Sequence, residues 1–88
     1  MEGFVYILKS LRNGRFYIGS TKNVYNRVIE HNLGKTQSTK HYIPWQLAFF
    51  KRYSDINKAK RIESKLKKAK SKEIIEMIIR DRDIKMGP

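Results

Sequence analysis

Cysteine is absent from this 88-residue chain. The protein therefore has no disulfide framework, no thiolate nucleophile and no cysteine-based zinc site, and this composition fits a reducing compartment. Long hydrophobic runs are absent as well, because the apolar run at residues 5–8 is short and nothing approaches the length of a membrane-spanning helix. We expect a soluble, unprocessed, cytoplasmic protein.

Acidic residues are scarce in the chain. Eight Asp and Glu stand against 20 Lys and Arg, which gives a formal net charge of +12. This charge would attract phosphate-rich partners and speed the encounter with them. A membrane surface is the alternative partner of a basic protein, but here the basic residues do not accompany a helix face rich in Trp, Phe and Leu. We expect DNA as the partner, with RNA left open, and neither a membrane nor a small-molecule substrate. The oligomeric state is not indicated.

The length and composition limit the number of domains. With 40% hydrophobic residues, the chain can supply one modest core. No internal repeat or low-complexity linker divides it. We predict a single domain that spans residues 1–88.

A β-hairpin is predicted at the start of the chain. Residues 3–9 and 15–20 are rich in aromatic and β-branched side chains. Asn13 and Gly14 lie between these segments, and both residue types tolerate the positive φ angles of a tight hairpin turn. We read the two segments as paired antiparallel strands.

The length of that turn decides which face of the sheet each side chain occupies. If Asn13 and Gly14 are the two central turn residues, Tyr6 and Tyr17 lie on one face. A loop longer by one residue would put the two tyrosines on opposite faces. The prediction that the two tyrosines act together therefore depends on the hairpin register.

A first helix is predicted over residues 24–33. Polar residues that can cap a helix precede it, and Gly34 is suited to end it. Arg27 and His31 are four residues apart, so their side chains project from the same side of the helix.

The next segments are a loop and a third strand. Residues 35–43 are polar and lack periodicity, which favours a mobile surface loop that carries His41. Residues 45–53 are aromatic and aliphatic, and we expect a third, largely buried strand.

A second helix is predicted to begin after Ser54 or Asp55, because apolar residues recur there at helical spacing. Residues 51–72 hold ten Lys and Arg and only two acidic residues. One of these, Glu63, falls beside the apolar stripe of the helix, away from the middle of its basic surface. We expect its carboxylate to face the body of the protein.

The C-terminal part is predicted to form one more helix. Ser71 caps it, four isoleucines form its buried face, and residues 81–88 follow as a charged tail. The order is then strand, strand, helix, strand, helix, helix. This order predicts an α/β (α+β) fold, a three-stranded antiparallel sheet flanked by helices.

Five features with chemical potential occur in a fixed order along these elements. They are Phe4-Val5-Tyr6, Tyr17-Ile18-Gly19, Arg27, His31 and Glu63. The series resembles the GIY-YIG nuclease domain family, and the resemblance covers nearly the whole chain. The short length is similar to that of small stand-alone members, which resemble the nuclease module of the repair excinuclease.

The resemblance has two departures. Phe4 replaces the glycine of the family's first triplet, which we expect to alter strand packing more than chemistry. Some members also place a late asparagine near the active site, whereas the last asparagine here is Asn57, too early to match it.

The resemblance implies a role for each matched residue in phosphodiester hydrolysis. Tyr17 is the candidate proton acceptor, and Tyr6 would share that role or orient the nucleophile. Arg27 would stabilise the charge that develops on the phosphate, because its planar fork can hold two oxygens. His31 would donate a hydrogen bond to the phosphate or assist proton transfer, since a histidine ring titrates near neutral pH. Glu63 would anchor one Mg²⁺ or Mn²⁺.

Basic residues outside this series are candidates for contacts with the nucleic-acid backbone. They are Lys22, Lys60, Arg61 and Lys67. Since no second domain supplies sequence-specific binding, target choice would depend on backbone charge and nucleic-acid shape.

Together these features predict a metal-dependent DNA endonuclease, in DNA repair or the processing of branched DNA. Each residue taken alone is more commonly structural, and only the joint spacing favours catalysis. The leading alternative is a nucleic-acid-binding module that keeps the fold without cleaving. A third possibility is a domain that serves a larger complex through protein contacts.

Overall fold

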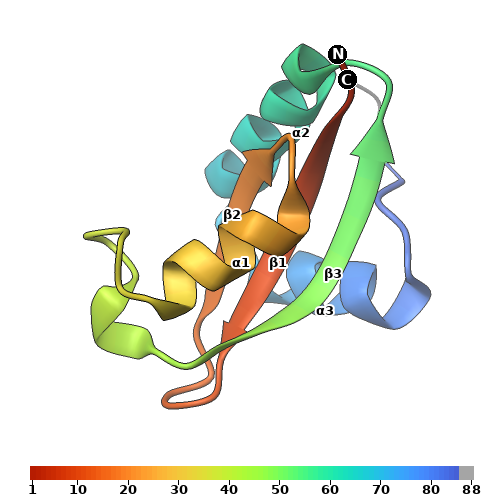
Figure 1. Ribbon diagram of the computed structural model, residues 1–88. Coiled ribbons are helices and arrows are strands. Elements are labelled where there is room, and N and C mark those ends of the chain that lie inside the picture. The colour runs from red at the N-terminus through yellow and green to blue at the C-terminus, as the bar shows by residue number, and fades with distance from the viewer. Residues whose placement is uncertain (86–88) are drawn as a thin grey trace.

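A computed structural model describes residues 1–85 (Figure 1). Its elements follow the predicted order: β1 (Gly3–Ser10), β2 (Phe16–Thr21), α1 (Val24–Asn32), a single 3₁₀ turn η1 (Lys40–Tyr42), β3 (Trp45–Tyr53), α2 (Ile56–Ala69) and α3 (Lys72–Asp81). The strands form one antiparallel sheet in the order β2-β1-β3. The predicted α+β fold is confirmed.

The helices lie on opposite faces of this sheet, with α1 in front of it and α2 and α3 behind it in the view of Figure 1. Because successive side chains of a strand point to opposite faces, β1 contributes to two cores. The core behind the sheet contains Val5, Ile7, Ile18, Phe49, Ala59, Ile62, Leu66, Ile78 and Ile84. The core in front contains Tyr6, Leu8 and Trp45, with Tyr17, Val24, Val28, Tyr42, Ile43 and Leu47 packed against them.

The hairpin loop is longer than predicted. The backbone N–H of Ser10 donates to the carbonyl of Arg15 over 2.8 Å, so residues 11–14 form the loop, and Gly14 has a φ of 78°. Asn13 does not adopt a positive φ; its side chain instead accepts the N–H of Arg15 over 3.0 Å. The prediction of a two-residue turn is wrong, because polar side chains form the hydrogen bonds that the backbone of a longer loop needs.

The side chains nevertheless keep the predicted faces. Leu8 lies opposite Tyr17, and Tyr6 lies opposite Gly19. The loop exceeds the predicted turn by two residues, an even number, so the alternation of faces is unchanged. Tyr6 and Tyr17 therefore share the face that α1 covers.

The segment between α1 and β3 is anchored, contrary to the prediction of a mobile surface loop. Thr39 is fully buried, and its carbonyl accepts the indole N–H of Trp45 over 3.0 Å. The side chain of Asn32 bonds both the N–H and the carbonyl of Trp45, over 2.7 and 3.0 Å. The reason is the polar backbone at the start of β3, which needs partners once it is buried. His41 remains exposed.

The prediction that β3 is largely buried is also wrong. The order β2-β1-β3 makes β3 an edge strand, and only part of its length is covered. Trp45 and Phe49 are buried, whereas the side chain of Phe50 is 53% exposed.

The two later helices, α2 and α3, begin directly after the residues that were predicted to cap them. Asp55, one of the two predicted candidates, accepts the N–H of Asn57 at the start of α2, and Ser71 accepts the N–H of Ile74 at the start of α3. Ile84 is buried within the predicted tail. The prediction of a trailing tail is therefore wrong at this point, and residues 86–88 lie outside the described part. Within residues 1–85, no helix is both long and apolar enough to cross a membrane.

Candidate active site

The hydroxyl of Tyr6 is the centre of a cluster between β1, β2 and α1. Its oxygen lies 2.9 Å from Nε2 of His31 and accepts a hydrogen bond from Nε of Arg27 over 3.4 Å. The ring of Tyr17 lies 6.3 Å from the Tyr6 ring and 5.0 Å from the His31 ring, measured between centroids. The fold thus brings four of the predicted site residues together.

Gly19 makes room for that hydroxyl. It lies opposite Tyr6 in the hairpin, and a Cβ atom at Gly19 would lie 2.4 Å from the Tyr6 oxygen. Any larger residue would displace the hydroxyl from its partners. The glycine of the Tyr17-Ile18-Gly19 triplet therefore has a steric role, which the triplet alone did not reveal.

A hydrogen-bond chain fixes the orientation of His31, which is fully buried. Its Nδ1 lies 2.9 Å from Oγ1 of Thr39, and that hydroxyl donates to the carbonyl of Thr36 over 3.4 Å. Because a threonine hydroxyl has one proton, Thr39 must accept from Nδ1–H, which leaves Nε2 to accept from Tyr6. The network thus assigns a neutral histidine whose Nε2 accepts a hydrogen bond from the Tyr6 hydroxyl.

The surroundings keep His31 uncharged at neutral pH. Burial, and to a smaller extent the positive charge of Arg27, lower the pKa of His31 to about 4. The prediction that this ring titrates near neutral pH is therefore wrong, because the fold removes the ring from water. Both ring nitrogens already have partners, so in this arrangement His31 holds Tyr6 and offers no donor to a phosphate.

The two tyrosines differ in their surroundings. Burial raises the pKa of Tyr6 to about 12, although the hydrogen bond from Arg27 opposes this shift. Tyr6 is therefore a neutral phenol under physiological conditions. Tyr17 is only partly buried, and within residues 1–85 its hydroxyl has no hydrogen-bond partner. Of the two, Tyr17 has the hydroxyl that remains available.

Arg27 connects this buried cluster to the surface. While its Nε donates to Tyr6, a terminal nitrogen pairs with Oε1 of Glu30 over 3.1 Å. The Arg27 side chain is 35% exposed, so part of its fork can meet an anion. Glu30 was not among the predicted site residues, although its spacing of three residues from Arg27 on one helix indicates the pair.

Glu63 lies on α2, behind the sheet, where it meets the side chain of Ser20 from the edge strand β2. Oε1 of Glu63 accepts a hydrogen bond from the Ser20 hydroxyl over 2.5 Å, and Oε2 pairs with Nζ of Lys67 over 2.6 Å. The same Lys67 nitrogen lies 5.5 Å from the centroid of the Tyr17 ring. Lys67 therefore lies between the carboxylate and the tyrosine cluster. No sequence signal pointed to Ser20, which is 43 residues away from its partner.

Residues 2–76 match the GIY-YIG catalytic domain. The chain belongs to the GIY-YIG family. A similar solved structure is the solution NMR structure of the UPF0213 protein BH0048 from Bacillus halodurans, with 29% sequence identity and a TM-score of 0.55, over 90% of this chain and 83% of that chain. No curated protein matches the chain. The predicted resemblance is confirmed, and with it a nuclease-type fold whose family implies a nucleic-acid substrate.

Glu63 is the residue whose carboxylate was predicted to hold a metal ion. Within residues 1–85, no group of three or more His, Cys, Asp or Glu residues is placed to hold a metal. The Glu63 side chain is 20% exposed, and a cation held by one carboxylate would take its other ligands from water and phosphate. Such a cation fits the site only if Lys67 moves from Oε2.

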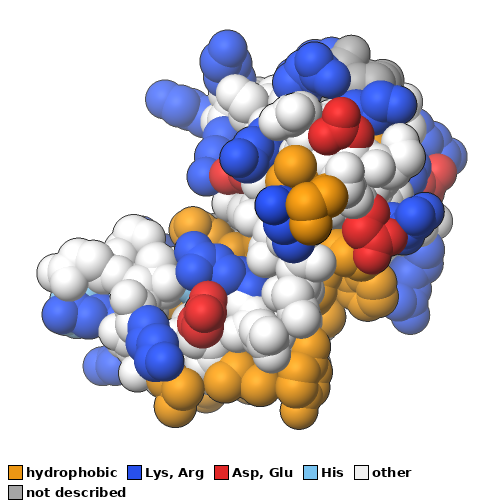
Figure 2. Space-filling model, turned by 45° about the horizontal axis from the view of Figure 1, so that its top comes forward, with side chains coloured by type: hydrophobic (Ala, Val, Ile, Leu, Met, Phe, Trp, Pro, Cys, Tyr) orange, Lys and Arg blue, Asp and Glu red, His pale blue; other side chains and the backbone are white. Residues whose placement is uncertain are grey.

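The basic residues surround this site unequally. Lys60 and Lys67 lie on the flank of α2 that carries Glu63, whereas the helical periodicity puts Arg61 on the opposite flank. Lys22 is exposed just before α1. Figure 2 shows Lys and Arg side chains spread over the face in view, while Asp and Glu side chains occur singly.

Proposed function

We propose that this protein is a metal-dependent DNA endonuclease that hydrolyses phosphodiester bonds, in DNA repair or the processing of branched DNA. One observation carries the proposal. The Tyr6 hydroxyl is fixed between His31 and Arg27, over Gly19 and beside the available hydroxyl of Tyr17. A satisfied polar network on a buried face holds its members in one geometry, which a catalytic site requires.

The proposed roles follow from exposure and hydrogen bonding. Arg27, partly exposed and oriented by two partners, binds phosphate oxygens and stabilises the charge that develops as the nucleophile attacks. Tyr17 contacts the attacking water and, in its deprotonated form, receives the proton of that water, with the Lys67 ammonium beside its ring. Tyr6 stays protonated and orients Arg27, and His31 orients Tyr6.

Glu63 is the proposed ligand of Mg²⁺ or Mn²⁺. A bound metal would stabilise the leaving oxygen as a Lewis acid. Ser20 fixes one carboxylate oxygen, which leaves the other to the cation once Lys67 turns to the phosphate. Lys22, Lys60 and Lys67 contact the nucleic-acid backbone near the site. Arg61, on the other flank of α2, adds only to the overall positive field.

Nicking of plasmid and branched DNA by the purified full chain in Mg²⁺ tests this function. We expect cleavage that Arg27→Ala lowers by about 100- to 1000-fold, as for loss of one transition-state donor. Glu63→Ala should lower it similarly, whereas Arg61→Ala, an exposed basic control on the same helix, should retain it. DNA left intact by the wild-type protein across all substrates would overturn the proposal. Cleavage that survives both site substitutions would indicate a contaminating nuclease.

The second candidate is a nucleic-acid-binding module without cleavage. It is favoured by the ion pair between Lys67 and Glu63, because this pair occupies the carboxylate proposed as the metal ligand. This candidate predicts salt-dependent DNA binding that Glu63→Ala does not weaken, with no nicking in any divalent cation.

A further inference from the structure

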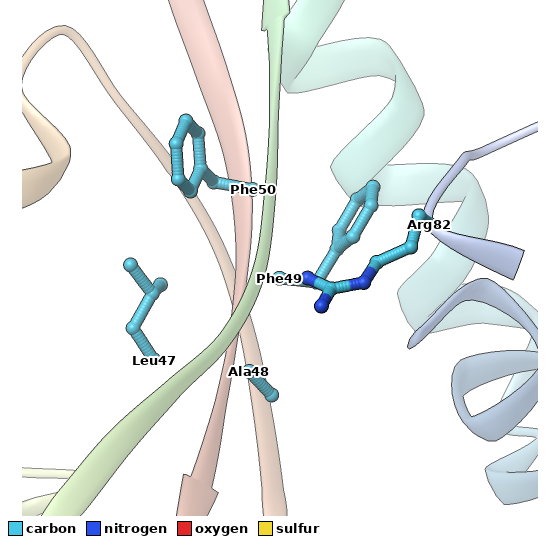
Figure 3. Close-up of a pocket in the computed structure, with 5 residues that line it drawn as sticks. All are labelled: Leu47, Ala48, Phe49, Phe50 and Arg82. Carbon is cyan, nitrogen blue, oxygen red and sulfur yellow. The ribbon is translucent and has the colours of Figure 1, made fainter. Parts of the chain in front are cut away.

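An aromatic pair is exposed on the face of the sheet that carries the candidate site. Phe50 of β3 is 53% exposed. Phe4 of β1, only partly buried, meets it edge-on, with ring centroids 6.1 Å apart and ring planes at 64°. Figure 3 shows Phe50 and Leu47 on one side of β3, and Phe49 with Arg82 on the other. Phe50 therefore points away from the core formed by α2 and α3.

The pair lies next to the candidate site. The sheet register places Phe50 opposite Tyr6, and it places Phe4 opposite Arg52. Residues directly opposite one another in adjacent strands share a face at about 5 Å between their Cβ atoms. Going across the sheet, the order on this face is Gly19, Tyr6 and Phe50. Phe50 is thus the residue next to Tyr6 across the sheet, on the side away from β2.

The charges around the aromatic pair indicate which kind of molecule binds there. The Arg52 side chain is 62% exposed on the same face and pairs with Glu2 through one guanidinium nitrogen, and the whole chain carries a net charge of +12. A second copy of so basic a chain would be repelled, whereas a nucleic-acid strand offers both an anionic backbone and flat aromatic bases. An exposed ring can stack on the base of a nucleotide, and the arginine beside it can attract the phosphate.

We propose that Phe50, braced by Phe4, is a stacking seat for an unpaired base of the substrate, next to the phosphate that Arg27 holds. The inference rests on the proposed function and adds a substrate class to it. A base inside a duplex has both faces stacked, so a free face exists only in single-stranded, branched or extruded nucleotides. The seat therefore selects strands with unpaired bases at the site.

Binding of labelled single-stranded oligonucleotides, measured by fluorescence anisotropy in EDTA, tests the seat without any cleavage. One base at a time is replaced by an abasic nucleotide. For the wild-type protein we expect one position at which the abasic nucleotide weakens binding by about tenfold. Phe50→Ala should weaken binding of the intact strand by a similar factor and show no abasic penalty at any position.

Matched variants separate stacking from other effects. Phe50→Tyr keeps an aromatic ring and should keep the abasic penalty. Phe50→Leu keeps the packing against Phe4 and should lose most of the abasic penalty. Phe50→Leu also serves if Phe50→Ala does not fold. Met77→Ala, which removes a side chain 49% exposed on α3 behind the sheet, should bind like the wild type.

Two results would overturn the seat. One is an abasic penalty equal in the wild-type protein and Phe50→Ala. The other is a wild-type dimer in sedimentation that Phe50→Ala dissociates, which would make the ring part of a protein interface. Failure of the proposed function is distinguishable, since absent nicking together with a Phe50-dependent abasic penalty would refute cleavage and leave the seat standing.

Discussion

The two faces of the sheet are built from the same three strands and hold different kinds of interaction. Behind the sheet, residues such as Val5 and Ile7 pack against aliphatic side chains of α2 and α3. In front, Tyr6, His31 and Thr39 form a chain of hydrogen bonds beneath α1. Aliphatic burial stabilises without direction, whereas hydrogen bonds fix positions. The difference teaches that one face supplies most of the stability and the other supplies geometry.

Alternation along β1 makes this division possible in a small chain. Val5 and Tyr6 are adjacent in sequence, both are almost completely buried, and they belong to different cores. Because one strand contributes to both faces, the effect of a substitution on one face can be compared with the effect of a substitution on the other.

The largest expected effect is on stability and comes from the face behind the sheet. Ile62→Ala empties a fully buried position of α2 and should lower the free energy of unfolding by about 2–5 kcal/mol. Urea denaturation measures this loss, and Ile29→Ala on the exposed side of α1 is the control. Nicking per folded molecule should be unchanged. Loss of nicking while the variant is still folded would show that the two faces are not separable.

The next effect is on geometry and comes from the front face. Gly19→Ala places a methyl group against the Tyr6 hydroxyl, which should cost about 1–3 kcal/mol of stability and move the hydroxyl from its partners. We expect nicking by the folded variant to fall far more than its stability. In Gly14→Ala the new methyl group meets nothing within 4 Å, so this variant should lose stability through its positive φ alone and keep nicking. Equal nicking by both variants would contradict the steric role of Gly19.

A smaller effect is the pH dependence that His31 contributes. The folded chain protonates His31 only near pH 4, and the unfolded chain near its ordinary value of 6.5. Between these values the unfolded state binds more protons, so the stabilisation is complete above pH 6.5 and is lost as the pH falls toward 4. The loss should be about 2–3 kcal/mol by pH 4.

Thermal unfolding at pH 7, 5.5 and 4.5 measures this pH dependence. His31→Gln should weaken it, while His41→Gln, at an exposed position, should not. Identical pH profiles for the two variants would mean that His31 takes up its proton equally well in the folded state.

The smallest effect concerns the link between the two faces. Lys67→Met removes the ammonium from Oε2 of Glu63 and should tighten Mn²⁺ binding a few-fold, because an exposed ion pair is worth about 1 kcal/mol or less. Titration calorimetry or Mn²⁺ spin resonance without DNA reads this directly. Lys60→Met on the same flank should bind the metal like the wild type. Weaker binding by Lys67→Met would show that Lys67 organises the carboxylate rather than competing for it.

Much of the fold was predictable because its signals are local. Asp55 and Ser71 cap the helices that they were expected to start, and all three strands lie where β-branched and aromatic residues concentrate. The hairpin loop was not predictable in length, since Ser10 and Asn13 satisfy a wider loop through their side chains.

The candidate site was predictable only as a set of residue types. The spacing of Arg27 and His31 on one helix indicated that they act together, and both bond the Tyr6 hydroxyl. Their protonation states were not predictable, because the burial of His31 depends on Thr39 and on the segment that carries it.

The sequence by itself determined the order of elements, the basic surface and the family, because periodicity, capping, composition and motif spacing are properties of the chain. Tertiary structure alone decided which polar groups from different elements meet. Ser20 reaches Glu63, Thr39 reaches His31, and Phe50 is left uncovered on an edge strand. Such contacts join residues from different elements, and their distances, burial and charge states exist only once the sheet and helices have packed.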